Sequence, residues 1–185
     1  ENIVNEQVAK LYSIIPQFIY SEIDEQIENY IANLLKERKL TICTAESCTG
    51  GKIAQMLTSI PGSSQYYKGS VIAYDNGIKT SFLNVPEEMM ADYGAVSEQV
   101  AATMAIEVRK KFNTDYSVAT SGIAGPEGGS EFKPVGTVYI AVSSDNGVIT
   151  ERYVFSKDRR SNINRFSIAS LNLLRKQILQ SVEPD

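Results

Sequence analysis

Short apolar runs alternate with segments of helical spacing along most of this chain, and this alternation limits the fold to a narrow class. Two of the apolar runs flank Asp145-Asn146-Gly147, which is a strong hairpin signal. Strands are predicted at residues 40–43, 69–74, 116–120, 137–144 and 148–156, and helices at 21–35, 53–60, 78–83, 87–93, 97–112 and 161–182. The pattern predicts an α/β fold in which helices cover both faces of a mixed, mainly parallel sheet that includes one antiparallel strand.

The length of 185 residues suits one domain, or one domain with an arm at its start. Residues 1–20 fit either a helix or a packed arm, because Pro16 interrupts their apolar side chains. Since the first residue is Glu1 rather than Met, we expect the chain to be a piece of a longer protein.

Charge and hydropathy argue against two classes of partner. The formal net charge of −4 disfavours nucleic acid, because proteins that bind duplexes usually carry a basic field. No apolar run approaches the roughly 20 residues that span a bilayer, so we expect no membrane contact. The sparse cysteines favour a cytoplasmic location. Cys43 and Cys48 are too few for a disulfide framework or a four-ligand zinc site.

The chain contains no histidine, and this restricts its chemistry. A Ser-His-Asp triad, a Cys-His pair and a His-ligated metal site are all excluded. Any nucleophile must therefore be activated by Lys, Tyr, Asp, Glu or a helix terminus. We expect neither a metal nor another cofactor.

The stretch "CTAESCTGG" forms the turn between a predicted strand and a predicted helix. Ser47 lies in this turn, at the carboxyl end of the strand, where open α/β sheets bind ligands. Gly50 and Gly51 let the backbone approach a ligand, and the helix start offers N–H groups to an anion or oxyanion. Three interpretations remain open: Ser47 or Thr49 caps the helix, Ser47 is a nucleophile, or Cys48 is one.

A second polar stretch, "YDNGIK", places Tyr74 at a strand end and Lys79 on the following helical turn. Both side chains could face the same sheet edge as Ser47. To act as a base near neutrality, Lys79 needs its pKa lowered by roughly 3 units, which a closed site can achieve. A solvated lysine on a first helical turn is the simpler interpretation.

A third stretch, "TSGIAGPEGG", begins a long loop rich in glycine and proline. Its glycine spacing after a strand suits a phosphate or carboxylate that is held by backbone N–H groups. It fits a surface loop with turn residues equally well.

Taken together, "TAESCTGG", "YDNGIK", "SGIAGPEGG", "KPVGTVYIAV" and "KDRR...NR" resemble the CinA C-terminal domain family in order and spacing. That family includes nicotinamide-mononucleotide deamidases. The resemblance covers roughly residues 21–185 and makes 1–20 an arm, or a connector from an N-terminal molybdopterin-binding-like domain. It implies a three-layer α/β/α sandwich, a homodimer, and hydrolysis of nicotinamide mononucleotide to nicotinate mononucleotide and ammonia.

The resemblance also implies particular site residues. Ser47 matches the family's proposed nucleophile, and Tyr74 and Lys79 match the polar residues proposed to activate it. The residues expected to bind substrate are Glu46, Thr49, Gly50, Gly51, Ser121, Gly122, Ile123, Ala124, Gly125 and Arg159. Asp75 replaces a serine that is common in relatives, and its charge could alter Lys79.

Two other functions are compatible with the sequence. One is a non-catalytic nucleotide-binding or dimerisation module of a larger CinA-type protein, since a domain can keep its site after losing the chemistry. The other is a phosphohydrolase, which the sequence supports less because no acidic metal cluster stands out.

Overall fold

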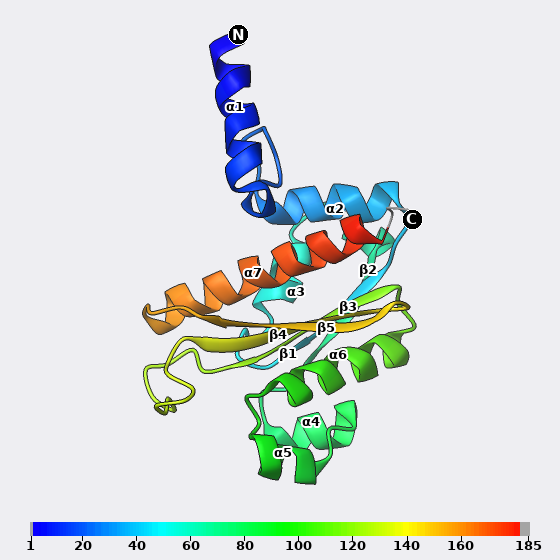
Figure 1. Ribbon diagram of the computed structural model, residues 1–185. Coiled ribbons are helices and arrows are strands. Elements are labelled where there is room, and N and C mark those ends of the chain that lie inside the picture. Colours follow the sequence, from blue (N-terminus) through cyan, green and yellow to red (C-terminus); the bar gives the residue numbers. More distant parts are fainter. Residues whose placement is uncertain (1, 182–185) are drawn as a thin grey trace.

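The computed structural model describes residues 2–181 and places a five-stranded sheet between two groups of helices (Figure 1). The strands are β1 (Ile42–Glu46), β2 (Tyr67–Ile72), β3 (Tyr116–Gly122), β4 (Thr137–Ser144) and β5 (Gly147–Val154). The helices are α1 (Asn2–Ile14), α2 (Ile27–Glu37), α3 (Lys52–Thr58), α4 (Asn76–Leu83), α5 (Glu87–Tyr93), α6 (Glu98–Phe112) and α7 (Arg159–Gln180), with 3₁₀ turns η1 (Pro16–Phe18) and η2 (Ser63–Gln65). The predicted α/β class is confirmed.

The sheet is mixed, with the strand order β2-β1-β3-β4-β5. β1 pairs in parallel with β2 and β3, whereas β4 is antiparallel to both β3 and β5. Across residues 2–181, β4 is therefore the one strand that runs against the other four. Because it lies between two of them, half of the neighbouring pairs are antiparallel, and the sheet is less parallel than we predicted.

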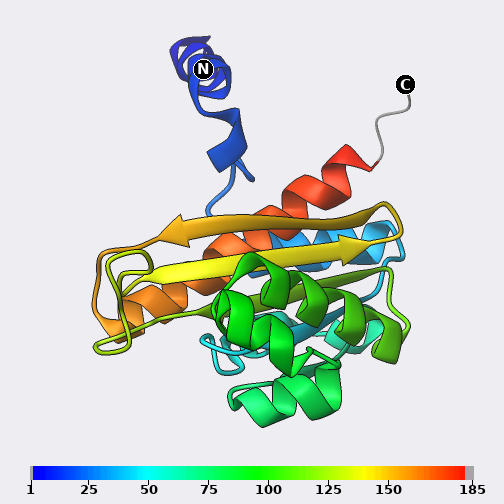
Figure 2. The same cartoon turned by 60° about the horizontal axis from the view of Figure 1, so that its bottom comes forward.

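Helices pack on both faces of the sheet, and successive side chains of a strand contribute to opposite faces. On one side Ile42 of β1 packs in a cluster with apolar residues of α2, α3 and α7. On the other side Cys43 and Ala45 pack with apolar residues of α4 and α6. Figures 1 and 2 show these two helical groups, with α6, α4 and α5 stacked below the sheet and α7 and α2 above it in Figure 1.

The carboxyl ends of four strands share one edge of the sheet, because β5 runs in the same direction as β1, β2 and β3. In register, Glu46 of β1 lies beside Ile72 of β2 and Thr120 of β3. The turns after these three strands, and α7 after β5, therefore begin close together. This is the edge at which open α/β sheets bind ligands.

Several predicted boundaries were shifted, among them the second strand, expected at 69–74 and found at Tyr67–Ile72, and two of the shifts have a clear cause. The helix expected from Ser21 begins at Ile27, because Ser21 Oγ instead accepts a hydrogen bond from Ile23 N–H in a local turn. The first strand continues to Glu46 rather than ending at Cys43, because buried polar residues extend it. The predicted helix end at Val182 lies outside the described residues.

Helix α1 stands away from the sheet and the other helices (Figure 1). The start of the chain is therefore helical up to Ile14, one of the two interpretations that the sequence left open. Its exposed side chains include Ile3, Val4 and Leu11. None of the helices within residues 2–181 is long and apolar enough to cross a membrane.

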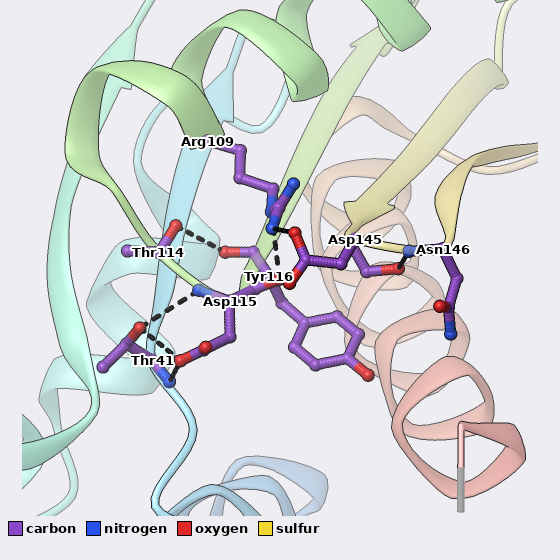
Figure 3. A network of polar contacts seen from close by, with 8 residues as sticks. Thr41, Arg109, Thr114, Asp115, Tyr116, Asp145 and Asn146 are labelled. Atoms are coloured by element: carbon purple, nitrogen blue, oxygen red, sulfur yellow. Dashed lines mark hydrogen bonds and ion pairs between the residues drawn. The ribbon is translucent and has the colours of Figure 1, made fainter.

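A polar network joins β1, β3, α6 and the β4–β5 hairpin at the edge opposite the shared one (Figure 3). Asp115 Oδ2 accepts hydrogen bonds from Thr41 N–H at 2.7 Å and Thr41 Oγ1 at 2.6 Å, and Asp115 N–H donates back to Thr41 Oγ1 at 3.1 Å. Arg109 Nε donates to the Asp115 carbonyl at 3.0 Å, and its guanidinium also pairs with Asp145. These contacts set the relative positions of the strand starts.

We expect Asp115→Ala to lower the free energy of unfolding by about 1–3 kcal/mol, because it leaves the partly buried Thr41 donors without an acceptor. Asp145→Ala is the matched control. Its carboxylate is 90% exposed, so losing the ion pair with Arg109 should cost at most about 1 kcal/mol. Urea unfolding of both variants measures the difference, and equal losses would contradict this assignment.

Candidate active site

Ser47 lies in the turn between β1 and α3 and is 8% exposed. Its backbone N–H donates to the Thr120 carbonyl at 3.1 Å, which holds the turn against the end of β3. Its hydroxyl forms no hydrogen bond with any residue between 2 and 181. Ser47 therefore does not cap α3, and that interpretation of the turn was wrong.

Glu46 caps α3 in its place. This buried carboxylate, the last residue of β1, accepts hydrogen bonds from the N–H groups of Gly51 at 3.0 Å, Ile53 at 3.0 Å and Ala54 at 2.7 Å. Its negative charge also lies against the positive end of the helix dipole. The Thr49 hydroxyl, which could have capped the helix, bonds instead to Thr120 Oγ1 at 2.8 Å.

Lys79 is buried and only 3% exposed, so it is not the solvated lysine that the sequence also allowed. It lies on the first turn of α4, where its Nζ donates to Asn76 Oδ1 at 2.9 Å. Burial lowers its pKa, an effect that Asp75 and Cys48 partly oppose. A larger fraction of Lys79 is therefore neutral near pH 7 than for an ordinary lysine.

Tyr74 lies at the rim of the site and is 59% exposed. Its hydroxyl accepts a hydrogen bond from Arg159 Nη2 at 2.8 Å, and Arg159 Nη1 donates to the Gly125 carbonyl at 2.7 Å. Arg159, at the start of α7, thus connects the turn after β2 with the loop after β3. These two contacts hold its guanidinium at the mouth of the site.

The end of β3 forms another wall of the site. Ser121 is buried, and its hydroxyl donates to the Ala95 carbonyl at 2.7 Å, which attaches the loop before α6. A Cβ at Gly122 would lie 2.6 Å from the Thr137 carbonyl and 3.0 Å from Cys48 Sγ, so only glycine fits there without displacement. Ile123 N–H already donates to the Thr137 carbonyl at 2.8 Å, so it offers nothing to an anion.

A cavity of about 210 Å³ brings together seven of the predicted residues. These are Ser47, Tyr74, Lys79, Ser121, Gly122, Ala124 and Arg159. The other six expected site residues do not line it: Glu46, Thr49, Gly50, Gly51, Ile123 and Gly125. Glu46 and Gly125 instead position the residues that do, through the cap of α3 and the contact with Arg159.

The cavity also has walls that sequence reasoning missed. Asn76 lines it beside Lys79, and Ala95 and Val96 close it from the loop before α6. Asn76 lies within "YDNGIK", so the stretch that indicated Lys79 also contained its partner. Nothing in the sequence signalled Ala95 or Val96, because only the folded chain carries this loop to β3.

Cys48 lines the cavity as well, but as an unreactive thiol. Burial raises the pKa of Cys48 to about 12, so the thiolate is scarce near neutrality. Since the thiolate is the nucleophilic form, Cys48 is a poor alternative to Ser47. Among residues 2–181, no group of three or more His, Cys, Asp or Glu side chains could hold a metal ion.

Comparison with known sequences agrees with this geometry. The pattern of the CinA C-terminal domain family matches residues 24–178. The chain belongs to this family. A CinA-like protein of Cytophaga hutchinsonii is 47% identical over 175 residues, and one of Prochlorococcus marinus is 46% identical over 182. These matches cover 95% and 97% of the chain but 42% of each relative, so the chain spans under half the length of these relatives.

Solved structures show the same domain architecture. A competence or damage-inducible protein from Enterobacter asburiae aligns with a TM-score of 0.79 at 32% identity, covering 82% of this chain and 96% of that one. The competence/damage inducible protein CihA from Agrobacterium tumefaciens aligns with a TM-score of 0.78 at 33% identity, covering 84% and 98%. Because nearly all of each relative is matched, a CinA C-terminal domain of this size folds on its own.

We expect Glu46→Gln to lower the free energy of unfolding by roughly 1.5–3 kcal/mol, because the amide has one acceptor oxygen and its NH₂ group opposes the three N–H donors. Faster amide hydrogen exchange across α3 should accompany the loss. Glu87→Gln is the control, since Glu87 is an exposed acid in the first turn of α5, whose start has no side-chain cap. Unchanged exchange in α3 for Glu46→Gln would contradict the capping role.

Proposed function

We propose that this domain is an amidohydrolase that converts nicotinamide mononucleotide to nicotinate mononucleotide and ammonia, with Ser47 as nucleophile. One observation carries the proposal: an unbonded serine hydroxyl and a buried lysine line the same small cavity. The family to which the chain belongs includes enzymes with this activity. In a chain without histidine, a lysine is a suitable base for a serine nucleophile.

Lys79 supports the role of base better than Tyr74 does. It is buried and its pKa is lowered, so a larger fraction of its amine can accept a proton than for an ordinary lysine. Tyr74 is largely exposed, and its hydroxyl oxygen already accepts a hydrogen bond from the Arg159 guanidinium. We assign Tyr74 to the rim of the site, where its bond to Arg159 positions the substrate.

The reaction proceeds in two halves. In the first, Ser47 Oγ attacks the carboxamide carbon while its proton passes to Lys79 Nζ. The tetrahedral intermediate then collapses, its C–N bond breaks, and Lys79 returns the proton to the departing ammonia. In the second half a water molecule attacks the resulting ester, and Lys79 takes the water's proton. Cleavage of the ester releases the carboxylate and restores the Ser47 hydroxyl.

The oxyanion of the intermediate needs N–H donors that are not already in use. Gly50 N–H donates to the Ser47 carbonyl at 3.1 Å, and Gly51 N–H donates to Glu46, so the pair that the sequence suggested is occupied. The N–H groups of Cys48 and Thr49 donate to no other residue in the part of the chain that the structure describes. They directly follow Ser47 in the chain, so we assign the oxyanion to them.

Two further features of the whole protein belong to the same proposal. We expect the chain to form a homodimer, and residues 1–20 to connect it to an N-terminal molybdopterin-binding-like domain. The short span of the chain relative to its CinA-like relatives supports the second expectation.

We expect Ser47→Ala and Lys79→Met each to reduce kcat for ammonia release from nicotinamide mononucleotide by roughly 10⁴–10⁶-fold, as loss of a nucleophile or its base does elsewhere. Ser156→Ala and Lys110→Met are the controls, since neither residue lines the cavity. A coupled ammonia assay measures the rates. Wild-type rates in Ser47→Ala would overturn the assignment, and saturable binding without turnover by the wild type would favour a binding module.

Lys79 should make stability depend on pH. Its folded pKa lies below the ordinary value of 10.5, so between the two pKa values the unfolded chain binds more protons, and stability rises with pH. We expect Lys79→Met to raise the free energy of unfolding at pH 7 by about 0.5–2 kcal/mol, and the gain to shrink as pH approaches 10.5. Urea unfolding across this range measures both. Parallel pH curves for the variant and the wild type would contradict the prediction.

A further inference from the structure

The segment that joins α5 to α6, residues 94–97, forms one wall of the cavity at Ser47. Ala95 and Val96 both line this cavity, and both residues are partly buried. The other aliphatic side chains in the lining are those of Ala95 and Ala124, so Val96 is the largest. The apolar part of the cavity is therefore limited mainly by Val96.

Hydrogen bonds from side chains hold this segment in place. The carbonyls of three successive residues, 93–95, each accept one such bond. The donors are, in order, Lys133 Nζ at 2.7 Å, Ser97 Oγ at 2.8 Å and Ser121 Oγ at 2.7 Å. They come from the loop after β3, the start of α6 and the end of β3. Because Val96 directly follows the last of these carbonyls, these three contacts set its position.

Gly94 allows the chain to turn at this point. Its φ of +80° and ψ of 153° are a backbone conformation that is essentially restricted to glycine. A Cβ at Gly94 would also lie 3.3 Å from Lys133 Nζ, which is closer than ordinary van der Waals contact. The close approach of Lys133 to the segment therefore depends on glycine as well.

Lys133 holds the segment from outside the cavity. It is partly buried, does not line the cavity, and its Nζ has the Tyr93 carbonyl as its one hydrogen-bond partner among residues 2–181. Its own loop is ordered by two bonds between Ser130 and Lys133, at 2.9 Å and 3.1 Å. A hydrogen bond from a charged donor is stronger than one between neutral groups, so Lys133 is a firm anchor for the segment.

The small volume of the cavity makes this wall important. About 210 Å³ is below the roughly 300–1,000 Å³ usual for small-molecule sites, so a ring in it has little free space. In an apolar site, one additional methylene group changes kcat/KM by about 10–200-fold. Shortening or moving the Val96 side chain should therefore change which rings fit beside the carboxamide.

We propose that Val96 determines specificity by limiting the acyl group to a ring with no further substituent on its carbon atoms, and that Lys133 positions Val96 through the Tyr93 carbonyl. The inference rests on the proposed function, which puts the ring of the substrate in this cavity. Neither Val96 nor Lys133 was among the site residues expected from the sequence.

The test compares nicotinamide mononucleotide with three analogues that each carry one methyl group, on ring carbon 4, 5 or 6. For each analogue, the ratio of its kcat/KM to that of the parent measures selectivity. We expect the wild type to reject at least one analogue, and Val96→Ala to raise the ratio for that analogue by about 10–100-fold, because its methyl group gains space. Lys133→Met should raise the same ratio by a smaller factor, since the wall is then held less firmly.

Two matched variants serve as controls. Val154→Ala shortens a valine that is 51% exposed, Lys68→Met removes an exposed lysine, and neither residue lines the cavity. Both should keep the wild-type ratios. Unchanged ratios in Val96→Ala would overturn the role of Val96, and wild-type ratios in Lys133→Met would overturn its positioning role.

A binding measurement separates this inference from the proposed activity. In a Ser47→Ala background, calorimetry should show that the parent nucleotide binds more tightly than at least one analogue, and that adding Val96→Ala reduces the difference. This result would support the inference even if the wild type released no ammonia. A difference in affinity that Val96→Ala leaves unchanged would overturn it. Thermal unfolding of each variant at the wild-type temperature shows that it is folded.

Discussion

The site depends on the hydrogen bonds that the Glu46 carboxylate accepts from the start of α3. A buried negative charge is costly unless hydrogen bonds and opposite partial charges surround it. Here three N–H groups at the start of α3 meet that need, and the carboxylate in turn satisfies donors that a helix start leaves unpaired. These hydrogen bonds join the end of β1 to α3 and so restrain the short turn between them. Ser47 lies in that turn and lines the cavity, and its hydroxyl forms no hydrogen bond with residues 2–181.

The parallel strands then bring the other groups to Ser47. β1 lies between β2 and β3, so their carboxyl ends are its direct neighbours, and the segment after each of them reaches the site. The turn after β2 carries Tyr74 and leads into α4 with Lys79, and the end of β3 carries Ser121 and Gly122. β5 points to the same edge, so α7 delivers Arg159 there. Burial of Lys79 disfavours its charged form and so costs stability, and in the proposed reaction the same burial makes the neutral amine more available as a base.

Ser47 and Glu46, two residues of one motif, show how much of the site can be predicted from the sequence. Ser47 and Glu46 are adjacent, and resemblance to the family marked both as site residues. The structure places Ser47 in the cavity and Glu46 on the far side of the turn, bonded to α3. Glu46 is the last residue of β1 and Ser47 is the first residue of the turn, so these neighbours in sequence have different surroundings. Lys79 gives the opposite case: its position in sequence suggested a solvated lysine, and only the packing around α4 shows it to be buried.

The α/β class could be predicted from the sequence alone, as could the order of strands and helices after residue 20, the Asp145-Asn146 hairpin and the absence of any histidine-based chemistry. These follow from local periodicity, turn residues and composition, which need no knowledge of distant contacts. The folded chain was needed to show that Glu46 rather than Ser47 caps α3, and that Arg159 bonds to Tyr74, 85 residues away. It was also needed to show that Ala95 and Val96 line the same cavity as Ser47. Each of these depends on which atoms meet across the shared sheet edge, and that meeting is set by strand order and register rather than by any single stretch of the chain.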